Sequence, residues 1–393
     1  MLRYLTRRFV SGLIAFLAFT AVLFFSFNLL IPGDYVTTLS LILPGNEARD
    51  ALRAELGLDQ PLWRQYFLWL GHLAQGNLGN EFSNFGQRAT PVSELLKVAL
   101  PSTILVFVSG ALVAFFLGQW LGKIISWRAP RWLSGAISLG SIGFYTAFPP
   151  WLSFLLGFAA IARLNISPRL ITSNGFRSRF WREAPIPSWM VMRSMIFSIL
   201  AMLVILILLR WLVTRLWRRR LHPLFLVILF CASVYALWAT ADILPYAVNI
   251  LQIAAIPFLT FVLLGFGDTV LLMQVSMIDT RHEQYVQLAR AKGLPERLVR
   301  NRHAARNAML PVLSRFIINL PYLLTAVVIV EKATGWPGVG DLLFTAIDDQ
   351  NTFVYLAIIV IVGLLSLFAR LTLDVAYVVL DPRLRYGDAR YSE

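Results

Sequence analysis

The chain has 393 residues, of which 58% are hydrophobic and only 14% are charged. Ordinary soluble domains carry about 25% charged residues, so this composition excludes a soluble globular protein. Several uncharged runs exceed the roughly 20 residues that a helix needs to cross a hydrocarbon core, and alternating ten-residue strands are absent. The sequence therefore predicts an all-α integral membrane protein, because helices satisfy their own backbone hydrogen bonds in lipid.

The net charge is +14, from 35 Lys and Arg against 21 Asp and Glu. In a membrane protein such an excess is typical of cytoplasmic loops, so it does not indicate a nucleic-acid partner. The single cysteine, Cys231, lies in an apolar run and cannot form an intrachain disulfide. Cysteine usage therefore does not reveal the compartment.

The N-terminus has basic residues followed by an uncharged run from Phe9 to Gly33. A cleaved signal peptide would have an apolar region of about 7–15 residues ending at small residues, whereas this run is longer and ends in Pro32-Gly33-Asp34. We interpret it as a retained first span. The polar residues 34–97 follow, with a helix expected through "NEARDALRAELG" and a Gly/Asn-rich loop at "GNLGNEFSNFG".

The apolar runs predict about eight membrane spans. They cover residues 9–31, 98–122, 132–162, 194–210, 222–241, 245–273, 312–331 and 354–379. An even number places both termini on one side, and roughly two thirds of the 35 Lys and Arg residues then fall on that side. The positive-inside rule predicts that this side is the cytoplasm. The basic outer loop 163–193 departs from the rule.

Catalytic motifs are missing from the sequence. The four histidines are scattered, with neither H-E-x-x-H nor a Cys/His cluster. "GQWLGKI" at 118–124 has one residue too few for a phosphate-binding loop, and "GWPGVGD" at 335–341 lacks the surrounding strand–helix unit of a nucleotide fingerprint. We expect no metal, no bound nucleotide and no enzymatic activity on this chain.

Polar residues inside spans are candidates for function because lipid makes them costly. They are Asn28, Gln119, Asn249, Gln252, Asp268, Asn319, Arg370 and Asp374. Arg370 and Asp374 are four residues apart and could neutralise each other on one helical face, which favours a structural role. Asp268 could line a pathway or lie solvated near the end of its span. An ion-coupled secondary transporter or channel remains the alternative function, weakened because no matched pair of buried carboxylates appears in two halves.

Residues 283–311, "EQYVQLARAKGLPERLVRNRHAARNAMLP", form a long cationic segment on the predicted cytoplasmic side. The first part favours a helix that Gly293 would end in a left-handed conformation, and Pro295 suits the first position of a second helix. Small side chains at Ala289, Ala291, Ala304, Ala305 and Ala308 would let another backbone approach closely. On composition alone, the segment could instead be an amphipathic loop resting on anionic lipid headgroups.

The order of residues in this segment resembles the cytoplasmic coupling motif of permease subunits in ATP-binding-cassette importers. The spacing of A-R-A-K-G (289–293) from R-H-x-x-R-N-A-x-L-P (302–311) is similar to that of the dipeptide/oligopeptide branch. Three further stretches agree, namely 56–82, "VIVEKATGWPGVGDLLFTAI" (328–347) and "DVAYVVLDPRLRYG" (374–387). The chain departs from the family at Asn77, at Arg370 and in "DDQNTFVY" (348–355).

The resemblance implies a type I importer fold with a six-helix permease core, to which residues 164–241 add a loop and a helical hairpin. The expected divisions are a first span (1–33), an extracytoplasmic region (34–97), two spans (98–163), the insertion (164–241) and a core (242–393) that contains 283–311. Such a subunit forms half of a translocation pathway for peptides or a related small solute in a bacterial or archaeal cytoplasmic membrane. The notable departure is the insertion, which could bind an extra partner, shield the pathway from lipid or enlarge the scaffold, and we favour the second role.

The implied partners are a second homologous permease subunit, two cytoplasmic ATP-binding subunits that carry ATP and magnesium, an extracytoplasmic substrate-binding protein and membrane lipid. The resemblance also implies a set of residues that contact the ATP-binding subunit. They are Tyr285, Ala289, Arg290, Ala291, Lys292, Gly293, Leu294, Arg302, His303, Arg306 and Asn307. It names no substrate-contacting residue.

Overall fold

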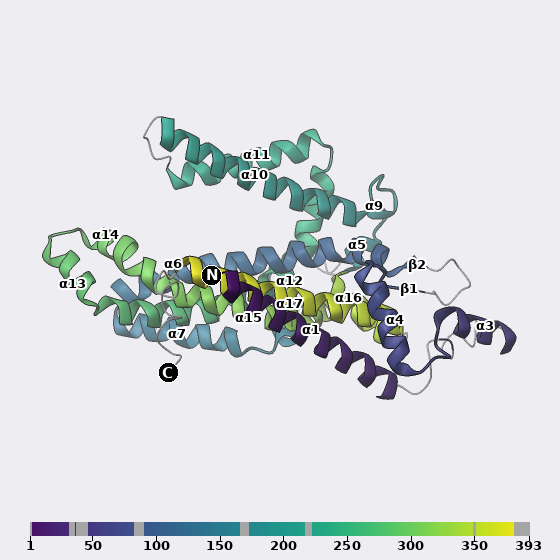
Figure 1. Cartoon of the computed structure of the whole chain (residues 1–393). Helices are drawn as coiled ribbons and strands as arrows, with labels where there is room; N and C mark the ends of the chain where they lie inside the picture. The colour runs from purple at the N-terminus through teal and green to yellow at the C-terminus, as the bar shows by residue number, and fades with distance from the viewer. Residues whose placement is uncertain are drawn as a thin grey trace, which may run out of the picture.

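A computed structural model describes residues 2–30, 36, 46–81, 90–165, 173–216, 222–348 and 351–380. The end of the expected first span at Pro32-Gly33-Asp34 and the C-terminal part of the 374–387 motif lie outside these residues. The described chain is almost entirely helical, as predicted (Figure 1).

The first half begins with α1 (Leu2–Leu30), α3 (Asn46–Leu56) and α4 (Leu62–Ala74). The two-residue strands β1 (Asn80–Glu81) and β2 (Thr90–Pro91) pair antiparallel, with Asn80 opposite Pro91. The chain continues through α5 (Val92–Thr103), the π-helical turn η2 (Ile104–Val108), α6 (Ser109–Arg128), α7 (Arg131–Thr146) and α8 (Pro149–Leu164).

The second half opens with the short turns η4 (Ser173–Arg177) and α9 (Arg179–Arg182), and then forms the hairpin α10 (Ser188–Leu216) and α11 (Pro223–Thr240). After it come α12 (Leu244–Arg281), α13 (Gln284–Ala291), α14 (Glu296–Leu298), the π-helical turn η5 (Val299–Ala304), α15 (Ala305–Thr334), α16 (Val339–Asp348) and α17 (Thr352–Leu380).

Each of the eight predicted spans coincides with helix. Among the described residues, five helical stretches are long and apolar enough to cross a membrane, or six if one bent pair counts as a single span. They are Thr6–Leu29, Val92–Arg128, Ser188–Leu216, Leu244–Arg281 and Phe353–Thr372. The apolar helix Leu224–Thr240 is shorter. The total of eight crossings therefore stays a prediction.

The expected continuous span 132–162 is wrong in one respect, because it consists of α7 and α8, which meet at an angle of 110°. Ala147 and Phe148 at the break have extended backbones, with ψ of 135° and 119°. The following Pro149 and Pro150 explain the bend. A residue before proline avoids the helical conformation, whereas proline is well placed in the first turn of a new helix.

Glycines bring α6 and α12 unusually close together. A Cβ atom on Gly118 would lie 2.6 Å from Cβ of Thr269, and one on Gly122 would lie 2.8 Å from the carbonyl oxygen of Val270. A Cβ on Gly267 of α12 would overlap the Ser141 backbone of α7. In lipid, where no hydrophobic effect drives helices together, such small-residue contacts are a main source of packing energy.

The opposite end of α15 is fixed by a buried carboxylate. Glu331, 1% exposed, accepts hydrogen bonds from the Thr103 hydroxyl at 2.7 Å and from the Gly340 backbone N–H at 2.6 Å. A side chain on Gly338 would overlap this carboxylate. The spacing E-x-x-x-x-x-x-G-x-G thus joins α5, α15 and the start of α16, which accounts for the motif at 331–340.

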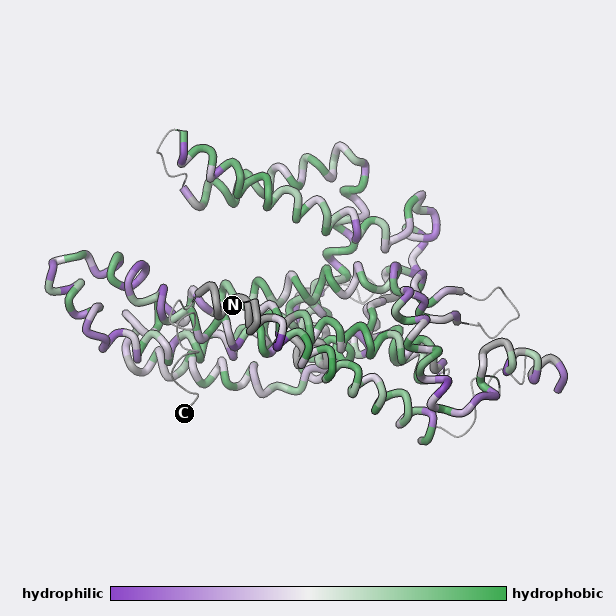
Figure 2. Tube along the Cα trace, in the orientation of Figure 1, coloured by the Kyte–Doolittle hydropathy of each residue, from purple (hydrophilic) through white to green (hydrophobic). Residues whose placement is uncertain are grey.

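The predicted hairpin is present as α10 and α11, and its described residues contact the bundle near one end (Figure 1). Val191, Met192 and Met195 of α10 are buried there. Trp238 of α11 donates to the Ser198 hydroxyl of α10 at 2.8 Å. The remainder of the hairpin exposes apolar side chains, and Figure 2 shows that its residues are mostly hydrophobic. Its role as a shield against lipid stays a prediction. That residues 164–241 are an insertion also stays a prediction.

The polar parts of the chain separate to the two ends of the bundle. In Figure 1, α13 and α14 project at one end, whereas α3, β1 and β2 lie at the other. Figure 2 shows that the helices between these ends are mostly hydrophobic along their length. This arrangement is the one that a bilayer-spanning bundle requires.

The close contact between α12 and α7 predicts that Gly267→Ala destabilises the protein, whereas Gly143→Ala on α7 does not. Both substitutions favour helix equally, but a Cβ at 267 overlaps backbone and a Cβ at 143 has no atom within 4 Å. Overpacking of this kind costs about 1–3 kcal/mol. Thermal unfolding in detergent should show a lower Tm for Gly267→Ala alone, and equal Tm values would contradict the packing argument.

Candidate functional site

The segment 283–304 forms a sharp corner at one end of the bundle. The helix α13 ends at Ala291 with Lys292 as its C-cap, and Gly293 follows with φ of +73°, a left-handed conformation that costs a side-chain-bearing residue about 1–2 kcal/mol. Pro295 has φ of −61° and an extended ψ of 138°, and it is the N-cap that precedes α14. The predicted left-handed turn at Gly293 is confirmed, whereas Pro295 lies one residue before the second helix and not at its first position.

The second helix differs from the expectation of a separate short helix. α14 continues through the π-helical turn η5 directly into α15. The corner and the long apolar helix α15 are therefore parts of one continuous helical stretch. π-Helical turns of this kind are frequent at functional sites.

Three side chains hold the corner in place. The Arg290 guanidinium donates from Nε to Oε1 of Glu296 at 2.9 Å, and the indole N–H of Trp127 at the end of α6 donates to Oε2 at 2.7 Å. The Arg290 charge also lies 5.0 Å above the Trp127 ring, within cation–π distance. The corner is thus attached to α6, which itself packs against α12.

These contacts set the charge of Glu296. The hydrogen bond from Trp127, followed by the contacts with Arg290, lowers the pKa of Glu296 below its ordinary value, because they favour the charged carboxylate. A group with a lowered pKa contributes stability above its ordinary pKa and loses it as the pH falls through the lowered one. The charge of Glu296 therefore contributes to the stability of the corner at neutral pH, and this contribution is lost in acid.

The small residues of the segment have a different role from the one expected. Ala289, Ala304, Ala305 and Ala308 are buried inside this chain, in a cluster with Met273 and Met277 of α12. Their surfaces are already occupied and cannot receive another backbone. Of the alanines expected to dock, only Ala291 is exposed.

The charged side chains of the segment divide into two groups. Arg290 is half-buried and paired with Glu296, so its charge is satisfied within the chain. Six members of the expected contact set are exposed at the corner and along the start of α15. They are Ala291, Lys292, Gly293, Arg302, Arg306 and Asn307. This surface is cationic and suits an acidic partner.

The remaining members of the set are partly covered. Leu294 and His303 are half-buried, and the Tyr285 hydroxyl has no hydrogen-bond partner among the described residues. Burial raises the pKa of Tyr285, opposed by the nearby Asn307 amide. The contact of Trp127 with Glu296 could not be predicted from the sequence, because it joins positions 169 residues apart. Arg300, which is 9% exposed, is a further residue of the segment to which the sequence assigns no role.

The polar residues predicted inside spans have three different outcomes. Asn28 donates to the carbonyl of Phe24 in its own helix at 2.8 Å, and Asn249 accepts from the Trp181 indole at 2.8 Å, so both are structural. Gln119 is partly buried, and its side-chain nitrogen has no partner among the described residues, whereas Gln252 and Arg370 are exposed. The side chain of Asp374 lies outside the described residues, so its pairing with Arg370 stays a prediction.

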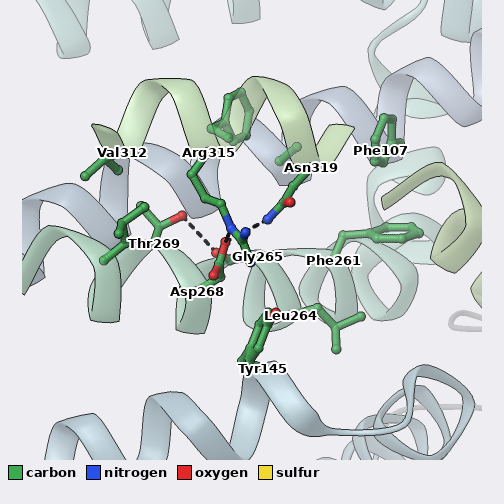
Figure 3. A pocket seen from close by; sticks show the side chains of 13 residues that line it. Phe107, Tyr145, Phe261, Leu264, Gly265, Asp268, Thr269, Val312, Arg315 and Asn319 are labelled. Atoms are coloured by element: carbon green, nitrogen blue, oxygen red, sulfur yellow. Dashed lines mark hydrogen bonds and ion pairs between the residues drawn. The ribbon is translucent and has the colours of Figure 1, made fainter. Parts of the chain in front are cut away.

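Asp268 and Asn319 meet in a pocket between α6, α7, α12 and α15 (Figure 3). The Asn319 amide donates to Oδ2 of Asp268 at 3.0 Å, and Nε of Arg315 lies 3.9 Å from the same oxygen. Asp268 and Asn319 were predicted as separate polar residues inside spans, and Arg315 was not predicted to lie beside them. Among the described residues, no cluster of three or more His, Cys, Asp or Glu could hold a metal ion.

The corner contacts predict that Trp127→Phe loosens the segment, because phenylalanine keeps an aromatic ring and loses the N–H donor. Limited proteolysis should cleave 281–298 several-fold faster in this variant. Trp132→Phe, at a 74% exposed ring on α7, is the matched control and should leave cleavage unchanged.

The same contacts give a pH test with Glu296→Gln. The wild type should have the higher Tm at neutral pH, and the two curves should converge as the pH falls below 4.5 and through the lowered pKa of Glu296. A difference that persists unchanged in acid would show that the carboxylate charge does not hold the corner.

Known proteins and family models match nearly the whole chain. Residues 120–386 match the family model described as the inner membrane component of binding-protein-dependent transport systems, and residues 1–96 match the N-terminal model of such membrane components. A candidate peptide permease of Brucella ovis is 29% identical, over 98% of this chain and 99% of that protein.

Two further relatives are similarly covered. The oligopeptide transport system permease AppB of Bacillus subtilis is 25% identical, and the glutathione transport system permease GsiC of Escherichia coli O6:H1 is 26% identical. Each match covers 98% of this chain and 100% of the relative. The chain therefore belongs to the family of inner membrane components of binding-protein-dependent transport systems.

Proposed function

We propose that this chain is the permease subunit of an ATP-driven importer, that it forms half of the pathway by which short peptides enter the cell, and that its α13–α14 corner docks on an ATP-binding subunit. The observation that carries this proposal is the exposed cationic corner, joined without interruption to α15. A separate ATP-binding subunit can move a membrane-spanning helix only if it binds a rigid segment that is continuous with that helix.

The substrate class comes from the relatives. Their names describe a candidate peptide permease, an oligopeptide permease and a glutathione permease, all of which are named for short peptides. We therefore assign short peptides to this chain in preference to other small solutes.

The assembly would contain a second homologous permease, two cytoplasmic ATP-binding subunits and an extracytoplasmic substrate-binding protein. ATP and magnesium would bind to the ATP-binding subunits, so this chain would be no enzyme by itself. Closure of those subunits would move the α13–α14 corner and, through η5, the helix α15. Arg302, Arg306 and Lys292 would steer the contact through their charge.

The orientation follows from the ends of the bundle. The cationic corner would lie in the cytoplasm together with both termini. α3, β1 and β2 would lie outside, where the substrate-binding protein releases the peptide. This placement agrees with the excess of Lys and Arg on the proposed inner side. The membrane is the cytoplasmic membrane of a bacterium or archaeon, and the relatives cited are bacterial.

Gly293→Val in the complete complex should lower both peptide uptake and substrate-stimulated ATP hydrolysis. A β-branched residue strains the left-handed corner, whereas asparagine tolerates this conformation and Gly293→Asn is the matched control. The measurement is uptake and ATP hydrolysis in proteoliposomes that contain the whole assembly. Normal stimulation in a fully assembled Gly293→Val complex would refute the role of the corner.

The same proteoliposomes distinguish an importer from an ion-coupled transporter. Uptake should need ATP and should persist when ionophores collapse the ion gradients. Uptake that stops with the gradient and ignores ATP would favour the secondary-transporter alternative.

A further inference from the structure

The pocket between α6, α7, α12 and α15 carries charge within the predicted spans. Asp268 lies inside the predicted span 245–273 and Arg315 inside 312–331. Arg315 is the fourth residue of its span and Asp268 the sixth from the end of its own, so both lie near the predicted cytoplasmic ends of these spans. Charged side chains within spans are rare and face a water-filled cavity or another protein surface, because contact with lipid is costly.

The two charges are accessible and only loosely paired. The Asp268 side chain is 25% exposed and that of Arg315 is 49% exposed. Their closest contact, 3.9 Å, is longer than a hydrogen bond. An ion pair that served only to neutralise its charges in lipid would be expected to be within hydrogen-bond distance and buried. This pair is open to whatever fills the pocket.

Each partner also has unused hydrogen-bonding capacity. Both Asn319 and Arg315 approach Oδ2 of Asp268, so Oδ1 has no partner among the described residues. The two terminal nitrogens of the Arg315 guanidinium are likewise without a partner in the described part of the chain. A free carboxylate oxygen can accept from an ammonium group, and a free guanidinium fork can bind a carboxylate through two parallel hydrogen bonds.

Most of the remaining wall is apolar, although Tyr145 and Thr269 also line it. Phe107, Phe261, Leu264 and Val312 line the pocket (Figure 3), as does Phe316. Such a wall accepts many side chains, whereas the two charges recognise only groups that every free peptide has. The combination suits a pathway that must pass peptides of varied sequence.

We propose that Asp268 and Arg315 form a transient binding site for the charged ends of a short peptide in transit, with Asp268 receiving the terminal ammonium and Arg315 the terminal carboxylate. This inference rests on the proposed function and deepens it. Asn319 positions the Asp268 carboxylate, and the flexible Arg315 stem lets the pair open around peptides of different length.

The test uses the complete complex in proteoliposomes, with ATP and labelled dialanine as the probe. Asp268→Asn, Arg315→Gln and the double variant should each lower dialanine uptake about tenfold or more, the size expected when a charge-assisted hydrogen bond is lost. Ser138→Ala, which removes a hydrogen bond between α7 and α12 outside the pocket, is the control and should keep wild-type uptake.

The double variant separates a binding role from a structural one. It leaves no unpaired charge, so a merely structural pair would regain both its Tm and its uptake. The proposal predicts wild-type Tm together with persistent loss of uptake. Recovery of uptake in the double variant, or wild-type uptake in both single variants, would overturn it.

A second measurement needs no variant. At equal occupancy of the substrate-binding protein, the wild-type complex should import dialanine about tenfold faster than N-acetylated dialanine, because acetylation removes the ammonium that Asp268 binds. Equal rates would overturn the inference and leave the peptide importer intact. A wild-type complex that imports no dialanine would instead refute the proposed substrate class, and this inference with it.

Discussion

The close packing of α6 against α12 is the contact on which the rest of the molecule depends. Gly118 and Gly122 remove the side chains that would hold the two backbones apart. Because α12 is 38 residues long, one helix then reaches the hairpin at one end, carries Asp268 in its middle and presents Met273 and Met277 to the corner at the other. A bundle held together in lipid by close packing has to be built around such a contact.

Two polar junctions fix the ends of this packed centre. At one end the Glu331 carboxylate binds the Thr103 hydroxyl and the Gly340 backbone, so α5, α15 and α16 are held as a unit. At the other, Glu296 binds Arg290 and Trp127, which attaches the corner to α6. The continuous helical stretch from α14 through η5 to α15 therefore runs from one junction to the other.

The charged side chains of the protein differ in whether they have an ion-pair partner within the chain. Arg290 is neutralised within the chain, whereas Lys292, Arg302 and Arg306 are exposed at the surface. Asp268 and Arg315 are intermediate, close enough to soften the cost of burial and too far apart to close their pocket. Satisfied charges therefore hold the shape, and unsatisfied ones mark the places where other molecules are expected to bind.

The sequence by itself determined the helical membrane class, the helical regions, the left-handed turn at Gly293 and the family resemblance, because each depends on apolar run length or on local backbone preference. It could not show that the alanines of 289–308 pack inward, or that α14 runs on into α15. The contacts of Trp127 with Glu296, of Thr103 with Glu331 and of Asp268 with Arg315 join residues far apart in the chain. Only the tertiary structure decided these, since hydropathy and spacing carry no information about which distant side chains meet.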